Sequence, residues 1–600
     1  MKEKILHNKK NVSDYFNEYK LISKRIAAQK NNDLKKVKIA LLSSSTIKGI
    51  ERVLFVQCCN LGITPEIFIG GYKQYHQEIL DDDSSFYKFK PDLVIINIDT
   101  RTLLGDNFFN YYQLSSAEKD NLYTNSLDDL LLLVDKIKHN IAAKIILHNF
   151  EVPTNSPLGI VESKQSFGLI EFVKKINFAL EEKFKNDNQV FIFDYENFCS
   201  KLGKNNIFDY KMYYIGDIKT GLKYFPELCF EYVSYIKPLM SLTKKCIVLD
   251  LDNTLWGGII GEDGLEGIKL GPSPDGRPFF EFQKYLLAMF NRGVILAINS
   301  KNNSEDALNA IRNHPYMILK EEHFASIKIN WNDKISNMKE ISKDINIGLD
   351  SLVFFDDDDF NREIVKTSLP EVEVVDLPKD PSLYLKTLAE LNSFNSFYLS
   401  EEDRMRGAMY AGQRKREELS RSTTNVEEYL KALKIKVTIE RVNSFNSSRI
   451  SQLTQKTNQF NMTTRRYSEE NIKQFSENSN SIVLSVRVED KFGDNGITGA
   501  VIIEKKKKEW IIDSFLLSCR IIGRKIEDVI LAYIAEEARK ENVDSIIGVF
   551  IPTNKNNPAK EFYAKNNFKL IKEDNNCQFW KLFVDKKLEY PEFIDVLISG

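Results

Sequence analysis

Two aspartates separated by a single residue stand out in the stretch VLDLDNTLWGG, which runs from Val248 to Gly258. Alternate residues of a strand face the same way, so Asp250 and Asp252 should project toward one place. Two carboxylates that lie this close repel each other unless a positive charge separates them. Mg²⁺ prefers oxygen ligands and removes the conflict. The spacing therefore predicts a magnesium site at the end of this strand.

Three later stretches supply further groups for phosphate chemistry. The apolar run in SLVFFDDDDF ends in four aspartates, of which we expect Asp356 and Asp357 to be metal ligands and the next two to be turn residues. Ser300 ends GVILAINS and offers a donor to a phosphoryl oxygen, and Lys334 in NWNDKISN offers a cation. Alone, Ser300 is typical of a helix cap and Lys334 of a surface lysine. The ordered set favours a catalytic site.

Apolar runs alternate with helix-like segments over much of the chain, which indicates parallel α/β sheets. A first group of strands is predicted at 37–46, 90–99, 144–150 and 189–194, and a second within 245–380, in KCIVLDLD, GVILAIN and SLVFFDD. From about Val426, strands such as KVTIERV, SIVLSVRV, GAVIIE, WIIDSF and SIIGVFI mix with amphipathic helices. The basic run EKKKKEW lies between two of these strands and is interpreted as a hairpin tip.

Bulk composition excludes several classes of function. The net charge of the 600 residues is -2, so no chain-wide case exists for nucleic acid or membrane as a partner. Seven scattered cysteines without a Cys-x-x-Cys pair are typical of a reduced, cytoplasmic protein. No apolar stretch has membrane-spanning length, and the start of the sequence lacks a signal peptide.

The central motifs resemble a known superfamily. The four motifs of haloacid-dehalogenase (HAD) phosphotransferases resemble DLDNT, Ser300, Lys334 and the acidic block. Longer stretches of the sequence resemble the FkbH-like branch of that superfamily. These stretches are KCIVLDLDNTLWGGIIGEDGLEGIKLG, INSKNNSEDAL, INWNDKISNMKEI and LDSLVFFDD, and later QLTQKTNQFNMTTRRY, DKFGDNGITG and LSCRIIGRKIED. The resemblance extends over nearly the whole chain and is weakest in the N-terminal third.

The resemblance implies a role for each central residue. Asp250 is expected to be the nucleophile that becomes an aspartyl-phosphate, and Asp252 the general acid and then base. Mg²⁺ is expected on Asp250, the backbone carbonyl of Asp252, and Asp356 or Asp357. The other two expected catalytic residues, Ser300 and Lys334, would stabilise the phosphoryl oxygens. Between Asp252 and the next strand there is room for glycine-rich loops and a helix but for no large cap domain, and an open site suits a bulky or protein-borne partner.

The C-terminal region resembles GNAT acyltransferases. CRIIGR places Arg520 and Gly523 as in the motif R-x-x-G-x-G/A, and with Arg524 they form the expected cofactor-binding set for a phosphopantetheine or pyrophosphate group. Lys525 stands at the last motif position. Cys519 lies beside Arg520 before an expected helix start, so we predict a transient acyl acceptor there. The alternatives are a domain of this shape without acyl-CoA chemistry and a merely packed cysteine.

The N-terminal region resembles SGNH esterases weakly. Leu-Ser-Ser, with Ser43, Ser44 and Ser45 at a strand end, stands where that family has Gly-Asp-Ser, and no histidine follows Asp194 or Asp209 at the required spacing. We therefore expect a structural or docking role for this region, not hydrolysis.

These observations predict a multidomain α/β protein. The expected domains are an SGNH-like α/β domain at 1–240, a HAD Rossmann-like domain at 241–384, a helical linker at 385–425 and a GNAT-like α+β domain at 426–600. The resemblance implies an Mg²⁺-dependent enzyme that takes a small phosphorylated three-carbon substrate, 1,3-bisphosphoglycerate, and loads its glyceryl unit onto the phosphopantetheine thiol of an acyl carrier protein, for a polyketide-like secondary metabolite or a surface glycan. A plain phosphatase and a non-catalytic scaffold are the alternatives.

Overall fold

The computed structural model describes residues 10–28, 35–399, 401–423, 425–443, 445–457, 459–553, 556–574, 577–585 and 587–599. Within them the chain forms two compact units, each described by itself. The first comprises Met1–Lys244 with Leu388–Leu399, and the second Lys245–Thr387 with Ser400–Gly600. Among the described residues, no helix has the length and apolar composition needed to cross a membrane.

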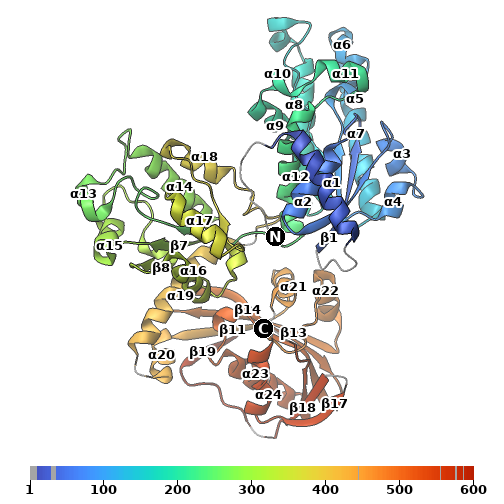
Figure 1. Cartoon of the computed structure of the whole chain (residues 1–600). Helices are drawn as coiled ribbons and strands as arrows, with labels where there is room; N and C mark the ends of the chain where they lie inside the picture. Colours follow the sequence, from blue (N-terminus) through green and yellow to red (C-terminus); the bar gives the residue numbers. More distant parts are fainter. Residues whose placement is uncertain are drawn as a thin grey trace. The chain divides into compact units, whose positions relative to one another are not determined.

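A five-stranded parallel sheet forms the centre of the first unit (Figure 1), in the order β2-β1-β3-β4-β5. Its strands are β1 Lys35–Ser43, β2 Ile63–Ile69, β3 Leu93–Asn97, β4 Lys144–His148 and β5 Val190–Phe193. Its helices are α1 Val12–Ala28, α2 Ile50–Asn60, α3 Tyr75–Leu80, α4 Ser85–Phe89, α5 Thr100–Leu104, α6 Asn107–Asn110, α7 Ser116–Asn140, α8 Leu169–Phe184, α9 Tyr195–Leu202, α10 Lys204–Ile207, α11 Tyr210–Gly216 and α12 Phe225–Leu239.

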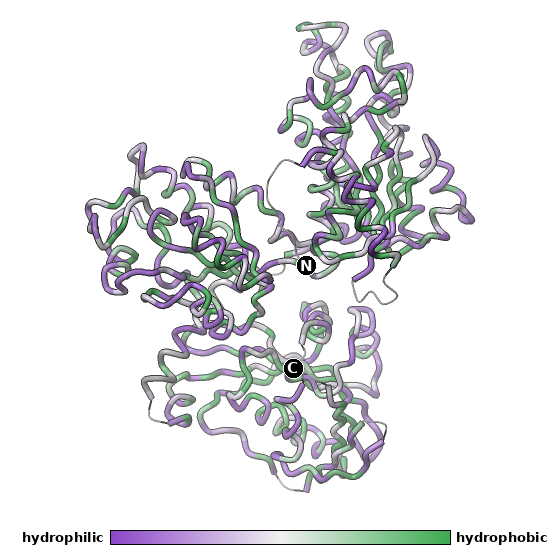
Figure 2. The backbone as a smooth tube through the Cα atoms, viewed as in Figure 1, coloured by the Kyte–Doolittle hydropathy of each residue, from purple (hydrophilic) through white to green (hydrophobic). Residues whose placement is uncertain are grey.

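Both faces of this sheet are covered, because successive side chains of each strand alternate between them. Ala40 and Leu42 of β1 pack with residues of α3, α4, α7 and α8. Ile39 and Leu41 of the same strand pack with α2, α9 and α12 on the other face. Figure 2 shows the strands as hydrophobic segments at the centre of the unit. The α/β fold class is confirmed.

A second parallel sheet, in the order β10-β9-β6-β7-β8, belongs to the second unit. Its strands are β6 Cys246–Leu249, β7 Ile295–Ser300, β8 Phe324–Ile329, β9 Leu352–Phe355 and β10 Glu373–Val374. The accompanying helices are α13 Ile260–Gly267, α14 Arg277–Asn291, α15 Ser304–Asn313, α16 Lys334–Asp344, α17 Asp359–Ser368 and α18 Tyr384–Ala389. Between β6 and β7, a segment that is fully described, the helices are α13, of 8 residues, and α14, of 15 residues.

Residues 385–425, which we predicted to be a linker, belong to both units: Leu388–Leu399 lie in the first unit and the rest in the second. The helix α19, Glu401–Ser422, packs within the second unit. Its Arg416 is buried and forms a bidentate ion pair with Asp490, at 2.7 and 2.8 Å. Its Arg414 donates to the carbonyl of Glu321 at 3.0 Å. This helix is therefore part of a packed structure, which sequence polarity alone did not indicate.

A mixed sheet forms the C-terminal part of the second unit, in the order β17-β18-β16-β15-β14-β13-β11-β19, with β12 paired to β15. The strands are β11 Ile435–Arg441, β12 Phe460–Asn461, β13 Ser481–Asp490, β14 Gly493–Lys505, β15 Glu509–Leu517, β16 Ser545–Phe550, β17 Lys569–Asp574, β18 Cys577–Phe583 and β19 Ile594–Ser599. The helices are α20 Val426–Leu433, α21 Ser447–Lys456, α22 Glu469–Glu477, α23 Ile526–Lys540 and α24 Phe562–Lys565.

Helices cover both faces of this sheet as well. Residues of α20, α23 and α24 share one buried cluster with the strands, and residues of α21 and α22 share another. The basic run EKKKKEW forms the tip between β14 and β15, where the amide of Lys506 donates to the carbonyl of Glu509 at 2.9 Å. The predicted hairpin is confirmed.

Candidate active site

A tight turn follows β6 and fixes the two aspartates that opened the sequence analysis. Asn253 has a positive φ of 53° and accepts, through its side chain, a hydrogen bond of 2.9 Å from the amide of Gly258. Asparagine and glycine tolerate this left-handed conformation better than other residues. Tyr384 donates to the carbonyl of Asn253 at 3.1 Å. The turn therefore presents Asp250 and Asp252 at the carboxyl edge of the sheet.

Three carboxylates converge at this edge. Oxygen atoms of Asp250, Asp356 and Asp357 lie within 4.8 Å of one another. β6 and β9 are neighbours on either side of the point where the strand order reverses, which is where open α/β sheets bind ligands. Asp356 is fully buried, and the described partner of its Oδ2 atom is Lys334, whose Nζ lies 3.1 Å away. Three carboxylates around one lysine leave negative charge that a cation can balance, so the three residues fit Mg²⁺.

Lys334 is the positive group of this cluster. It begins α16, its side chain is 3% exposed, and its Nζ lies 2.7 Å from Asp250 Oδ1 and 3.1 Å from Asp356 Oδ2. The same Nζ donates to the carbonyl of Asn299 at 2.7 Å. Burial acts to lower the pKa of Lys334, but the charges of the two aspartates outweigh it and hold the pKa above its usual value. Lys334 is therefore a charged, buried lysine and not a surface residue.

Two carboxyl groups in the acidic loop after β9 have raised pKa values. Burial, followed by the negative charge of Asp250, raises the pKa of Asp356 to about 6 and that of Asp357 to about 7. Arg362 stabilises this loop by donating hydrogen bonds to the backbone carbonyls of Asp356 and Asp357, at 2.6 and 2.8 Å. The site thus concentrates negative charge that one lysine does not balance, as a metal site requires.

The carboxylate of Asp252 lies outside that cluster and has its own partners. It accepts hydrogen bonds from Trp256 Nε1 at 2.8 Å, the amide of Ile260 at 3.0 Å and Asn302 Nδ2 at 2.7 Å. Burial is the main cause that raises the pKa of Asp252. A carboxyl that is held in place and binds its proton more tightly suits acid–base work. The expected metal contact of this residue, through its backbone carbonyl, stays a prediction.

The remaining residues of the predicted set occupy the same sheet edge. Ser300 is buried and ends β7, the strand beside β6. Asp358 caps α17 by accepting from the amide of Phe360 at 3.0 Å, and Asp359 pairs with Arg362. That Asp358 and Asp359 are turn residues rather than metal ligands stays a prediction.

Sequence reasoning missed the residues that hold this arrangement. Trp256 and Asn302 bind Asp252, and Arg362 binds the acidic loop. Trp256 and Asn302 fall inside stretches that were quoted as motifs, but nothing in their spacing shows which carboxylate they contact. Such contacts arise from side-chain hydrogen bonds across the loop or between separate loops.

The C-terminal candidates have protein partners. Arg524 is buried and donates to Asp490 at 3.0 Å and to Gln413 at 2.8 Å. Arg520 Nη1 lies 3.0 Å from the sulfur of Met409. Gly523 has a positive φ of 80°, just before α23. A role for Arg520, Gly523 and Arg524 in cofactor binding therefore stays a prediction, and here the buried guanidinium of Arg524 pairs with a protein carboxylate.

Cys519 opens a short 3-10 helix, Cys519–Ile521, at the end of β15. Its side chain lies outside the described part of the structure. The predicted acyl acceptor at this position therefore stays a prediction.

The raised pKa values of Asp356 and Asp357 predict how pH changes the stabilisation of the protein by Mg²⁺. Unfolded aspartates titrate near 3.9, so between about pH 4 and pH 7 the folded, metal-free protein holds more protons than the unfolded chain. Asp356 and Asp357 therefore make the free energy of unfolding of the metal-free protein fall as pH rises. Bound Mg²⁺ removes this penalty, so we expect the Mg²⁺-induced rise in Tm to grow from pH 5 to pH 8, measured as the difference between thermal unfolding in MgCl₂ and in chelator. An equal rise at both pH values would contradict the metal site.

Comparisons with known proteins agree with this description. Residues 38–237 match the family described as "FkbH, N-terminal domain". The N-terminal part of the protein BF1531 from Bacteroides fragilis, whose crystal structure contains a phosphatase domain complexed with Mg, is 30% identical; the match covers 65% of this chain and all of that chain, with a TM-score of 0.59. No curated protein matches this chain.

Two further structures show weaker likeness. The GNAT domain of S. lividans PAT is 12% identical, and the match covers 24% of this chain and 89% of that domain's chain, with a TM-score of 0.21. The Campylobacter jejuni N-acetyltransferase PseH is 16% identical, covers 24% of this chain and 97% of its own, and has a TM-score of 0.18. At these scores the GNAT resemblance of the C-terminal region stays a prediction.

Proposed function

The chain belongs to the same family as BF1531 and carries an FkbH N-terminal domain at residues 38–237, and on this premise we propose that it is an Mg²⁺-dependent HAD-type phosphatase that acts in glyceryl transfer. The observation that carries this proposal is the convergence of Asp250, Asp356 and Asp357 around Lys334 at one sheet edge. The substrate would be 1,3-bisphosphoglycerate, and the acceptor the phosphopantetheine thiol of an acyl carrier protein. The substrate and acceptor come from the resemblance to FkbH-like proteins.

Asp250 acts as the nucleophile in this proposal. One of its carboxylate oxygens attacks phosphorus, and the bond from phosphorus to the leaving oxygen breaks. Lys334, already 2.7 Å from Asp250, orients that carboxylate and balances the charge of the transferring group. Mg²⁺, held by Asp250, Asp356 and Asp357, would supply charge neutralisation at the phosphoryl oxygens.

Asp252 moves the protons. Its carboxyl gives a proton to the leaving oxygen in the first step and takes one from the attacking water in the second, which restores Asp250 and releases phosphate. Trp256 and Asn302 hold this carboxyl in one orientation, at 2.8 and 2.7 Å. Its raised pKa favours the protonated form that the first step needs.

Replacing Asn302 with alanine tests this positioning role. We expect kcat to fall about tenfold, since one hydrogen bond to a charged group contributes about 1.5–3 kcal/mol. Loss of a donor raises the pKa of Asp252 further, so the alkaline limb of kcat/KM should move to higher pH. Asn309→Ala, an exposed asparagine on α15, is the matched control. An unshifted pH profile together with unchanged kcat would contradict the assignment.

Exposed aromatic residues next to the site support a large partner. Trp331 precedes Lys334 by three residues and is 76% exposed, and Phe360 follows the acidic loop and is 68% exposed. Large apolar side chains in such positions are typical of contact surfaces. Together with the short α13 and α14, they suit a substrate that is borne on a protein.

The proposed function is tested with the full chain, Mg²⁺, 1,3-bisphosphoglycerate and candidate carrier proteins. Intact-mass analysis of the carrier should show a glyceryl adduct, with phosphate released in parallel. Phosphate release from the ester without any loading of a carrier would indicate a plain phosphatase instead. Neither product, with chelator and Mg²⁺ giving equal results, would contradict both.

We also propose that Cys519 relays the acyl group. Its thiolate would attack the acyl carbon of the acyl phosphate, the bond from that carbon to the phosphate oxygen would break, and the thioester would pass to the carrier thiol by exchange. Five other cysteines are less suited, because burial raises the pKa of Cys59 to about 11 and also raises those of Cys58, Cys199, Cys229 and Cys246.

Incubation with the donor and no carrier should therefore give a hydroxylamine-labile adduct on the wild type and none on Cys519→Ala, as read by intact protein mass. Cys577→Ala, a partly exposed cysteine on β18, is the matched control and should form the adduct normally. Equal adducts on wild type and Cys519→Ala, or normal carrier loading by that variant, would remove Cys519 from the mechanism.

A further inference from the structure

The first unit contains a cavity of about 390 Å³ at the carboxyl edge of its sheet. Ser45 follows β1, Asn97 ends β3, Glu151 follows β4 and Tyr195 follows β5, and all four line the cavity. The strand order reverses between β1 and β3, so the cavity lies at the point where open α/β sheets bind ligands. Its volume is in the range of small-molecule sites, roughly 300–1,000 Å³.

Arg101 is the most informative group on the wall of this cavity. Its guanidinium lies 4.9 Å from the ring centre of Tyr213, 5.0 Å from Phe108 and 5.1 Å from Phe208. Among the described residues, no carboxylate or carbonyl pairs with it. Aromatic rings that surround a guanidinium fix its direction but leave its in-plane N–H donors available. Arg101 is therefore positioned to bind an acceptor that the chain itself does not supply.

The other charged groups of the cavity are already satisfied or nearly neutral. Lys219 pairs with Asp99, and Asp99 accepts from the hydroxyl of Ser44 at 2.6 Å. Lys204 pairs with Glu196 and donates to the carbonyl of Val152 at 3.0 Å. These contacts hold the cavity in shape and leave Arg101 as the cation that a ligand would meet.

Negative charge in the cavity is low enough to admit an anion. Burial and the charge of Asp99 raise the pKa of Glu151 to about 7, so this carboxyl carries only part of its charge near neutral pH. Lys204 is paired with Glu196, and Lys219 with Asp99 and Asp217, so these two lysines add no unbalanced positive charge. The guanidinium of Arg101 has no carboxylate partner among the described residues, and beside a partly neutral Glu151 it favours a negatively charged ligand.

Hydrolytic chemistry does not explain the cavity. The histidine of this sheet, His148, is fully inside the core, where it contacts the hydroxyl of Tyr232 at 3.0 Å and burial lowers its pKa to about 3. No histidine lines the cavity, and Ser44 donates to the carboxylate of Asp99 rather than to an imidazole. Among the described residues, the cavity therefore contains an arginine without a carboxylate partner and no serine–histidine pair.

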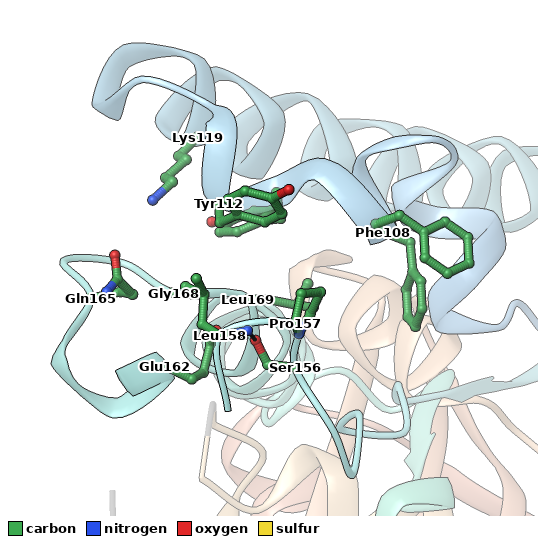
Figure 3. Close-up of a pocket in the computed structure, with 12 residues that line it drawn as sticks. Phe108, Tyr112, Lys119, Ser156, Pro157, Leu158, Glu162, Gln165, Gly168 and Leu169 are labelled. Atoms are coloured by element: carbon green, nitrogen blue, oxygen red, sulfur yellow. Dashed lines mark hydrogen bonds between the residues drawn. The ribbon is translucent and has the colours of Figure 1, made fainter. Parts of the chain in front are cut away.

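A much smaller cavity adjoins it. Figure 3 shows Phe108 and Tyr112 on one side of this smaller cavity and Ser156, Pro157 and Leu169 on the other. Phe108, Ser156, Pro157 and Leu169 also line the larger one. With about 10 Å³ it has room for roughly one water molecule, so a ligand belongs in the larger cavity.

We propose that this cavity binds a small organic anion, whose carboxylate or phosphate pairs with Arg101 and whose carbon skeleton lies against Phe108, Phe208 and Tyr210. The site is separate from the acidic cluster of the second unit and does not depend on its activity. It gives the N-terminal region a ligand-binding role, where the sequence indicated only a structural or docking one.

Calorimetric titration of the full chain tests the proposal. The Asp250→Asn form in chelator prevents turnover at the other site, and benzoate, phenyl phosphate and the uncharged benzyl alcohol serve as probes. We expect benzoate or phenyl phosphate to bind at least about tenfold more tightly than benzyl alcohol, since a charge-assisted pair contributes about 1.5–3 kcal/mol. The tighter of the two anions identifies the preferred acidic group. The proposal would be overturned if benzyl alcohol bound as tightly as both anions, and this comparison needs no substitution at Arg101.

Arg101→Met should abolish that preference while leaving benzyl alcohol binding within about twofold, with thermal unfolding as the check on folding. Arg52→Met is the matched control, because Arg52 also lies over aromatic rings, 5.0 Å from Phe16, but is paired with Glu51 and does not line the cavity. Unchanged anion affinity in Arg101→Met, or an equal loss in Arg52→Met, would overturn the proposal.

Discussion

Asp250→Asn is expected to lower phosphate release by on the order of 10⁴-fold while the protein remains folded. The substitution keeps the shape of the side chain and removes the oxygen nucleophile. It also removes the repulsion with Asp356 and Asp357, whereas Lys334 keeps Asp356 at 3.1 Å. We therefore expect the Tm without metal to stay within a few degrees of wild type. Single-turnover phosphate release and thermal unfolding are the measurements.

Asp275→Asn is the matched control for that experiment. Asp275 lies in the same domain, and its side chain is 57% exposed and 3.8 Å from Lys269. Its substitution should change neither rate nor Tm appreciably. Phosphate release by Asp250→Asn near the wild-type rate would show that this residue is not the nucleophile.

Asp356→Ala and Asp357→Ala should affect magnesium to different degrees. Asp356 is fully buried and lies 3.1 Å from Lys334, whereas Asp357 is partly exposed. We expect Asp356→Ala to abolish the Mg²⁺-induced rise in Tm and to lower activity by at least about 100-fold, and Asp357→Ala to weaken Mg²⁺ by roughly 10–100-fold. Activity of the wild type should likewise be lost in chelator and return with Mg²⁺.

Asp358→Ala provides the adjacent control. Asp358 caps α17, so its loss should cost about 1 kcal/mol of stability but leave Mg²⁺ affinity close to wild type. If Asp356→Ala bound Mg²⁺ as tightly as Asp358→Ala, the metal would have to lie elsewhere.

Strong local patterns were sufficient for much of the fold. The runs that became β1, β3, β4 and β5 each contain three or more consecutive apolar residues, and a polar residue ends or directly follows each strand, as is common for buried parallel strands. Several strands were missed: β2, β8 and β10 of the parallel sheets, and β12, β17, β18 and β19 of the C-terminal sheet. β2 contains Pro65 and Glu66 and lies at a sheet edge, and β8 contains Ser326 and Lys328 and lies at an edge too. Edge strands are less buried, so their composition carries a weaker signal.

The sequence by itself determined the chemistry of the candidate site. Asp250, Asp252, Ser300, Lys334 and the acidic run were recognisable because a carboxylate pair at a strand end and a later acidic block have few structural explanations together. Parallel strands bring their carboxyl ends to one edge, so the convergence of these residues also followed from the strand pattern.

Only the tertiary structure decided which groups touch. Examples are the ion pair of Lys334 with Asp250 and the hydrogen bonds that Trp256 and Asn302 donate to Asp252. Another is the contact of Arg101 with the ring of Tyr213. The conformations of the loops decide whether these side chains come close together. Arg101 and Tyr213 are far apart in the sequence, and neither belongs to a motif. A hydrogen bond or ring contact depends on distances of a few ångströms between side chains, and residue types and spacing along the chain do not encode those distances directly.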